Sequence, residues 1–281
     1  MFDFDNNTTR FSLLNALRLA EASQLVYVPS WDEVEKKILG EWGFASFRPF
    51  DKEDAEAFIC GNDAVLILAF RGTQTLEDWQ TDFKVKLVKS SVGRVHRGFT
   101  ESLDNIWEDI KQSIAQFCDK SQKIWITGHS LGAALAALAV DRLTEGEEEV
   151  SGLYTFGQPR VGDKEFAENF DWKIKSRSFR FVNDEDIVTR VPPRLLGYEH
   201  IGTVRFFDYQ GTLFKDNIAW KRWLSSCESG SARSLDRFSE LKGQYPNCTE
   251  DHSLNRYLAN IRKNYIKEKG VKTYKDYLAG M

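Results

Sequence analysis

The sequence of 281 residues has few of the residues that mark small disulfide-rich, metal-binding or nucleic-acid-binding proteins. Its four cysteines form no CxxC pair and no Cys/His cluster, so we expect neither a disulfide scaffold nor a metal site. Lys and Arg total 38 against 42 for Asp and Glu. A nucleic-acid partner is not expected, because it would require a basic surface. With six prolines and 42% apolar residues, the composition is that of a globular protein.

The sequence also has no long hydrophobic run. Its longest aliphatic stretch, residues 64–70 (AVLILAF), is too short to span a bilayer. The first residues, MFDFDNNTTRF, do not have the basic and then apolar pattern of a secretion signal. Both absences predict a soluble, cytoplasmic protein without a transmembrane segment. A bridge between Cys227 and Cys248, which bracket a polar loop, stays open because it would require an oxidising compartment.

No Pro/Gly/Ser-rich linker and no internal repeat divides the chain, so we expect one domain over residues 1–281. Short apolar runs alternate with segments of helical periodicity. The predicted strands are 43–50, 55–60, 64–70, 123–127, 152–156 and 178–182, and the predicted helices are 10–26, 99–117, 131–143 and 254–265. This alternation predicts an α/β fold, a mostly parallel central sheet with helices on both faces.

The most informative segment is 123–140, KIWITGHSLGAALAALAV. It contains G-x-S-x-G at residues 128–132, between a predicted buried strand and an alanine-rich predicted helix. In that context Ser130 sits on a tight turn and is a candidate nucleophile. Small residues at 128 and 132 allow the strand and the helix to approach each other. The backbone N–H of Leu131, at the helix N-terminus, can point at a developing oxyanion.

With these residues in hand, the chain resembles the class 3 lipases, a family of triacylglycerol lipases, feruloyl esterases and related acyl hydrolases. The resemblance runs through AFRGT (69–73), DWQTDF (78–83), VHRGF (95–99), ITGHSLGAALA (126–136), VNDEDIVTRVPP (182–193) and DHSLNRYL (251–258). It implies an α/β-hydrolase fold and hydrolysis of carboxylic esters of lipids without a cofactor.

Hydrolases of this fold carry their triad in the order Ser, acid, His. After Ser130 only His200 and His252 remain as bases, and the acid could be Asp184 or Asp186, which both follow the strand 178–182. The family pattern aligns its acid with Asp186 and its histidine with His252.

Three other histidines are read as structural. His129 leaves the turn in another direction than Ser130, His200 leads into a strand-like run, and His96 is out of the chain order for a base.

The family position for a second oxyanion donor is Thr73, with Arg71 beside it as a structural ion-pair residue. In the family, a lid covers the active site. Here it corresponds to about residues 73–83, where Leu76, Trp79 and Phe83 form one helical stripe; an ordinary surface helix is the alternative.

The segment from about 209 to 251 is longer than the family connection that we expect. It places Phe214, Ile218, Trp220, Trp223 and Leu224 among basic residues. This pattern predicts an amphipathic helix that lines the acyl groove or touches a lipid surface, with a helix packed on the domain as the alternative.

The leading hypothesis is therefore a monomeric acylglycerol lipase or esterase that acts through Ser130, Asp186 and His252, with transient contact to a lipid interface. The resemblance leaves open a phospholipase A1, a galactolipase or a feruloyl esterase. A non-catalytic lipase-like scaffold is a further alternative, but such proteins tend to lose triad residues, and here every expected position is filled.

Overall fold

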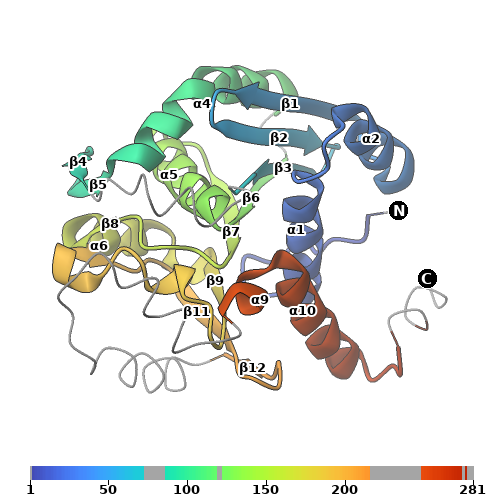
Figure 1. Cartoon of the computed structure of the whole chain (residues 1–281). Helices are drawn as coiled ribbons and strands as arrows, with labels where there is room; N and C mark the ends of the chain where they lie inside the picture. The colour runs from blue at the N-terminus through green and yellow to red at the C-terminus, as the bar shows by residue number, and fades with distance from the viewer. Residues whose placement is uncertain (1, 73–85, 119–121, 216–247, 274–275, 277–281) are drawn as a thin grey trace.

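The structure, a computed structural model, describes residues 2–72, 86–118, 122–215, 248–273 and 276. Its centre is an eight-stranded sheet with the order β1-β2-β3-β6-β7-β9-β11-β12 (Figure 1). The strands are β1 (Ser46–Lys52), β2 (Ala55–Gly61), β3 (Val65–Phe70), β6 (Lys123–His129), β7 (Val150–Phe156), β9 (Ser178–Asn183), β11 (Thr203–Phe207) and β12 (Leu213–Phe214). Neighbours from β3 to β11 are parallel, whereas β1, β2 and β12 pair antiparallel. The predicted α/β-hydrolase fold is confirmed.

Helices cover both faces of this sheet (Figure 1). On one face lie α4 (Arg97–Phe117), α5 (Leu131–Glu145) and α6 (Lys164–Ile174), and on the other α1 (Leu13–Leu25) and α10 (Leu254–Lys269). Strand β3 shows why both faces need cover. Leu66, Leu68 and Phe70 belong to the first core, while Val65, Ile67 and Ala69 belong to the second, because side chains alternate along a strand. A strand buried on both faces reads as a continuous apolar run, as 64–70 does.

Several elements were not anticipated from the sequence. They are α2 (Trp31–Glu35), the π-helical η1 (Lys36–Trp42), α6, the short turns η2 (Lys175–Arg177), η3 (Val188–Arg190) and η4 (Arg194–Leu196), α9 (Cys248–His252), and a small sheet of β4 (Leu87–Lys89), β5 (Arg94–His96), β8 (Gly162–Asp163) and β10 (Tyr198–Glu199). The helix expected around Phe214 is wrong at that residue, which lies in strand β12 and pairs with Phe206.

Four expectations fall on parts of the chain outside the described residues. These are the oxyanion donor Thr73, the lid residues Leu76, Trp79 and Phe83, the insertion between 216 and 247, and the pairing of Cys227 with Cys248. Within the described ranges, the helices are all too short or too polar to cross a bilayer.

A buried carboxyl group on α5 gives the fold a pH-dependent stability. Asp141 is 3% exposed, and burial followed by the nearby Glu145 raises its pKa to about 6, although Lys173 Nζ lies 3.6 Å from Oδ1. In the unfolded chain the pKa of an aspartate is about 3.9. Between these two values the unfolded chain has lost a proton that the folded chain keeps, so stability falls as the pH rises from about 4 to about 6.

We therefore expect Asp141→Asn to be more stable than the wild type at pH 8 and equally stable near pH 4. The gain should be about 1–2 kcal/mol, less than the roughly 3 kcal/mol that two pKa units represent, because Lys173 loses its partner. Urea unfolding at both pH values measures the difference. A gain of the same size at pH 4 and pH 8 would contradict this account of Asp141.

Candidate active site

Ser130 lies on a strained turn between β6 and α5. Its backbone has φ 58° and ψ −128°, a conformation that residues other than glycine rarely adopt. The flanking glycines are required by close packing. A Cβ on Gly128 would overlap the carbonyl of Gly132, and a Cβ on Gly132 would overlap the carbonyl of Phe70 at the end of β3. The turn therefore presents the Ser130 side chain at the carboxyl end of the parallel strands.

The structure brings Ser130, His252 and Asp186 together. His252 Nε2 lies 2.9 Å from Ser130 Oγ, and His252 Nδ1 lies 2.9 Å from Asp186 Oδ1 and 3.0 Å from Oδ2. All three side chains are buried, with exposures of 3%, 4% and 0% for Ser130, His252 and Asp186. A carboxylate that holds one ring nitrogen leaves the other nitrogen aimed at the hydroxyl oxygen.

Two further donors hold the Asp186 carboxylate in place. Val188 N–H donates to Oδ1 at 2.9 Å, and the Tyr257 hydroxyl donates to Oδ2 at 2.5 Å. The Tyr257 oxygen in turn accepts the N–H of Asn183 at 3.0 Å, so its single hydrogen is directed at Asp186. Burial and then the charge of Asp186 hold the pKa of Tyr257 well above its ordinary value. The buried Asp186 carboxylate is therefore held by three donors, from His252, Val188 and Tyr257.

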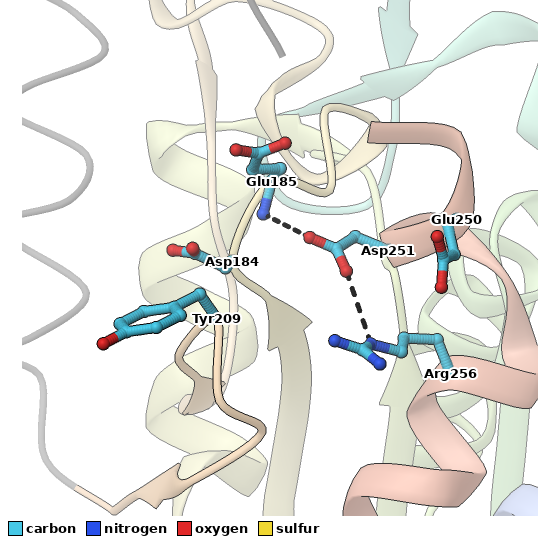
Figure 2. A pocket seen from close by; sticks show the side chains of 6 residues that line it. All are labelled: Asp184, Glu185, Tyr209, Glu250, Asp251 and Arg256. Atoms are coloured by element: carbon cyan, nitrogen blue, oxygen red, sulfur yellow. Dashed lines mark hydrogen bonds and ion pairs between the residues drawn. The ribbon is translucent and has the colours of Figure 1, made fainter. Parts of the chain in front are cut away.

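The alternative acid, Asp184, lies elsewhere. Its carboxyl group lines a surface pocket together with Tyr209 and Arg256 and with the carboxyl groups of Glu185, Glu250 and Asp251 (Figure 2). Burial and the neighbouring carboxyl groups, Asp251 first, raise the pKa of Asp184 to about 6. The geometry thus joins Asp186, and not Asp184, to His252.

The segment that carries His252 is tied to the acid loop through Asp251. Its carbonyl accepts from Asn183 Nδ2 at 2.7 Å, and its carboxylate accepts from the N–H of Glu185 at 3.0 Å and lies 3.6 Å from Arg256 Nε (Figure 2). Ser253 then caps α10, its hydroxyl accepting from Arg256 N at 3.2 Å. The segment of His252 and the loop of Asp186 are therefore held at a fixed separation.

The remaining histidines have other surroundings. His96 caps α4, its Nδ1 accepting from Phe99 N at 3.3 Å, and burial lowers its pKa to about 4. Burial and the charges of Arg180, Arg160 and Arg194 hold the pKa of His200 well below its ordinary value. His129 bonds to Tyr27 and to the carbonyl of His252.

The two expected oxyanion donors differ in what the structure describes. Leu131 is the first residue of α5, so its N–H has no partner within the helix and lies next to Ser130. Thr73 lies outside the described residues. Arg71, two residues before it, forms an ion pair with Glu56.

Sequence reasoning missed two residues that contact the triad. Tyr257 lies within the predicted helix 254–265, and nothing in its spacing reveals a hydroxyl partner. Gly157, at φ +62°, follows β7, and a Cβ there would lie 2.9 Å from both Asp186 Oδ2 and His252 Nδ1. A glycine directly after a buried strand was the available signal.

We expect Tyr257→Phe to lower kcat by about 10- to 100-fold with little change in KM, because a hydrogen bond to a charged group contributes about 1.5–3 kcal/mol. Steady-state kinetics on a short-chain ester measures it. Tyr265→Phe, at an equally buried position two turns further along α10, is the matched control. A Tyr257→Phe enzyme with kcat within twofold of the control would show that the hydroxyl does not support Asp186.

Together, the parallel sheet, the strained serine turn and the Ser-His-Asp hydrogen bonds are the features of an α/β-hydrolase fold with a serine triad. Comparison with known proteins agrees: residues 67–196 match the sequence model of the lipase (class 3) family. A lipase of Rhizomucor miehei is 35% identical over 177 residues, which cover 59% of this chain and 47% of that protein. These similarities support the class 3 lipase family that the motifs suggest.

Two further comparisons support this assignment. A secreted mono- and diacylglycerol lipase of Fusarium solani is 33% identical over 157 residues, covering 54% of this chain and 46% of that protein. The crystal structure of a lipase from Rhizopus microsporus var. chinensis superimposes with a TM-score of 0.55 at 29% identity, covering 69% of this chain and 72% of the other. The chain spans about half the length of the curated relatives it matches.

One expectation is corrected by these relatives. The cytoplasmic location expected from the sequence is contradicted, because relatives in Fusarium and Malassezia are named secreted lipases. That expectation depended on two absences, of a long hydrophobic run and of a secretion-signal pattern in the first residues.

Proposed function

We propose that this protein is a serine hydrolase that cleaves carboxylic esters of lipids, an acylglycerol lipase or esterase. The observation that carries the proposal is the unbroken series of hydrogen bonds from Ser130 through His252 to Asp186, set on a strained turn at a helix N-terminus. Each member has one role. Ser130 is the nucleophile, His252 the general base and acid, and Asp186 the group that fixes the ring.

The reaction follows from this arrangement. His252 Nε2 takes the proton of Ser130 while Oγ attacks the ester carbonyl carbon, and the resulting imidazolium returns the proton to the leaving alcohol. An acyl-enzyme remains on Ser130. Water then attacks it with the same base, releasing the acid and restoring the hydroxyl.

The negative charge that develops on the carbonyl oxygen needs donors at a fixed place. The N–H of Leu131 supplies one, at the positive end of α5. We assign the second to Thr73 from its place in the family motif. Removing such a donor typically costs about 2.7–4 kcal/mol of transition-state stabilisation.

The names of the relatives support acylglycerols as substrates and an extracellular site of action. Phospholipid, galactolipid and feruloyl esters are the alternatives within the same chemistry. We further propose that residues 1–281 act as one monomeric domain with a lid at about 73–83 and an insertion at about 209–251.

A hydrolysis panel tests the substrate class. Mono-, di- and triacylglycerols of increasing acyl length are compared with a phosphatidylcholine, a galactolipid and methyl ferulate, with Ser130→Ala as the blank. Acylglycerols should give the highest kcat/KM. A preference of tenfold or more for another head group would move the assignment to that class, and a wild type as inactive as Ser130→Ala on every ester would remove the proposal.

We also expect only modest interfacial activation. The segment proposed as the lid has three large apolar residues in its sequence, Leu76, Trp79 and Phe83, and so few side chains offer little apolar area to bury. Activity on a short-chain triacylglycerol, measured below and above its solubility limit, should rise by less than tenfold at the limit. A larger jump would contradict a weakly apolar lid.

A further inference from the structure

A second series of hydrogen bonds, one buried and two partly buried, runs beside the Ser130–His252 pair, through two side chains that the proposed reaction does not use. The Tyr27 hydroxyl oxygen lies 3.1 Å from the N of Gly72 and 2.8 Å from His129 Nδ1. His129 Nε2 lies 2.7 Å from the carbonyl oxygen of His252. The segments joined in this way are far apart in the chain: the end of α1, the end of β3, the end of β6 and α9.

The direction of every hydrogen bond in this series follows from the carbonyl of His252. A carbonyl only accepts, so His129 Nε2 carries the hydrogen. In a neutral imidazole Nδ1 is then an acceptor, and the Tyr27 hydroxyl must donate to it. Its oxygen remains free to accept the N–H of Gly72. Burial, and next the adjacent His252, lower the pKa of His129 to about 3, so the ring is neutral at the pH values at which esters are assayed.

Packing leaves this series little freedom. The rings of His129 and His252 lie 4.7 Å apart at 31°. At Gly72 a Cβ would overlap the Tyr27 hydroxyl and lie 2.6 Å from the carbonyl of His129.

The Tyr27 ring is also fixed from its other side. The Arg71 guanidinium lies 5.6 Å above the ring centre, and Arg71 is itself ion-paired with Glu56 on β2. The hydroxyl of Tyr27 therefore cannot shift without moving the ends of β3 and β6.

We propose that Tyr27 and His129 are positioning residues, which hold the chain at Gly72 and the backbone of His252 in a fixed arrangement around Ser130. The inference deepens the proposed ester hydrolysis and rests on it. Neither side chain touches the ester. The Tyr27 hydroxyl holds Gly72 after the end of β3, one residue before the expected oxyanion donor Thr73. His129 holds the backbone of His252, the residue that moves the proton. Errors of about 1 Å in such placements can cost about 100-fold in rate.

The test is kinetic, with Tyr27→Phe, His129→Phe and the double variant assayed on a short-chain p-nitrophenyl ester. Tyr27→Phe should lower kcat by about 10- to 100-fold with KM within twofold, and the rate of inactivation by a fluorophosphonate should fall by the same factor. Because both residues belong to one series, the double variant should be no slower than the slower single variant.

The matched control is Tyr154→Phe. Tyr154 is buried, and its hydroxyl accepts from the N of Ser12 at 3.1 Å, at the opposite end of α1 from Tyr27. Tyr154→Phe therefore also removes a tyrosine hydroxyl that holds the backbone at one end of α1. The kcat of this variant should stay within twofold of the wild type. Thermal unfolding of all variants shows whether a loss of activity exceeds the loss of stability.

Two results would overturn the inference: a Tyr27→Phe enzyme with the kcat of Tyr154→Phe, or losses from the two single variants that multiply in the double variant. If His129→Phe does not fold, the first comparison still decides. Failure of the proposed function would look different, since the wild type itself would neither hydrolyse esters nor react with the fluorophosphonate.

Discussion

Replacing Ser130 with alanine is expected to lower ester hydrolysis by on the order of 10⁶-fold and to abolish labelling by a fluorophosphonate probe. The reason is geometric: Ser130 Oγ is the oxygen at hydrogen-bond distance from His252 Nε2, and alanine leaves the base with no proton to take. The measurements are kcat on a soluble ester and gel fluorescence of the labelled protein.

The control for this change is Ser113→Ala. Ser113 is also fully buried, but it lies on α4, where its hydroxyl donates to the carbonyl of Asp109 and accepts from Arg48. It should label and turn over like the wild type. Labelling that persists in Ser130→Ala would place the nucleophile elsewhere, while a wild type that does not label would favour the non-catalytic scaffold.

The second large effect is expected at the acid. Asp186→Asn should lower kcat by about 10⁴-fold, because an amide cannot hold the His252 tautomer that keeps Nε2 free to accept the serine proton. Asp184→Asn, two residues away, is the matched variant, and its kcat should stay within a few-fold of the wild type because Asp184 lines the surface pocket. Comparable losses in the two variants would contradict the assignment of Asp186.

Asp184 and Asp186 show what spacing in the sequence could not predict, namely which carboxyl group contacts His252. Both follow a predicted strand, and spacing alone leaves them equivalent. In the structure the chain turns after β9, with Asp186 N–H donating to the carbonyl of Asn183, and Val188 N–H then donates to the Asp186 carboxylate. This local turn aims one carboxylate inward, and only the family motif indicated which one.

The nucleophile was easier to predict because its requirements are local. A buried strand, small residues at 128 and 132 and a helix directly after Ser130 are all visible within 18 consecutive residues. The fold class followed in the same way from the alternation of apolar runs and helical periods.

The supporting residues could not be predicted, because their partners are distant in the chain. Tyr257 bonds to Asp186 across 71 positions, and Tyr27 bonds to His129 across 102. Helix α6 was missed for a different reason. Its apolar side is made of Phe166, Ala167, Phe170 and Ile174 among many charged residues, a weak signal until Asp163 is seen to cap its first turn.

The backbone of Ser130 has a consequence for how this gene can change. At φ 58° a β-branched threonine is strongly disfavoured. The substitution of serine by threonine, which is common elsewhere, is therefore not expected at this position. Glycine, in contrast, would relieve strain of about 1–3 kcal/mol. The Ser130→Gly protein would then be inactive but more stable than the wild type. Without purifying selection, mutation would therefore tend to remove the nucleophile and leave a well-folded chain.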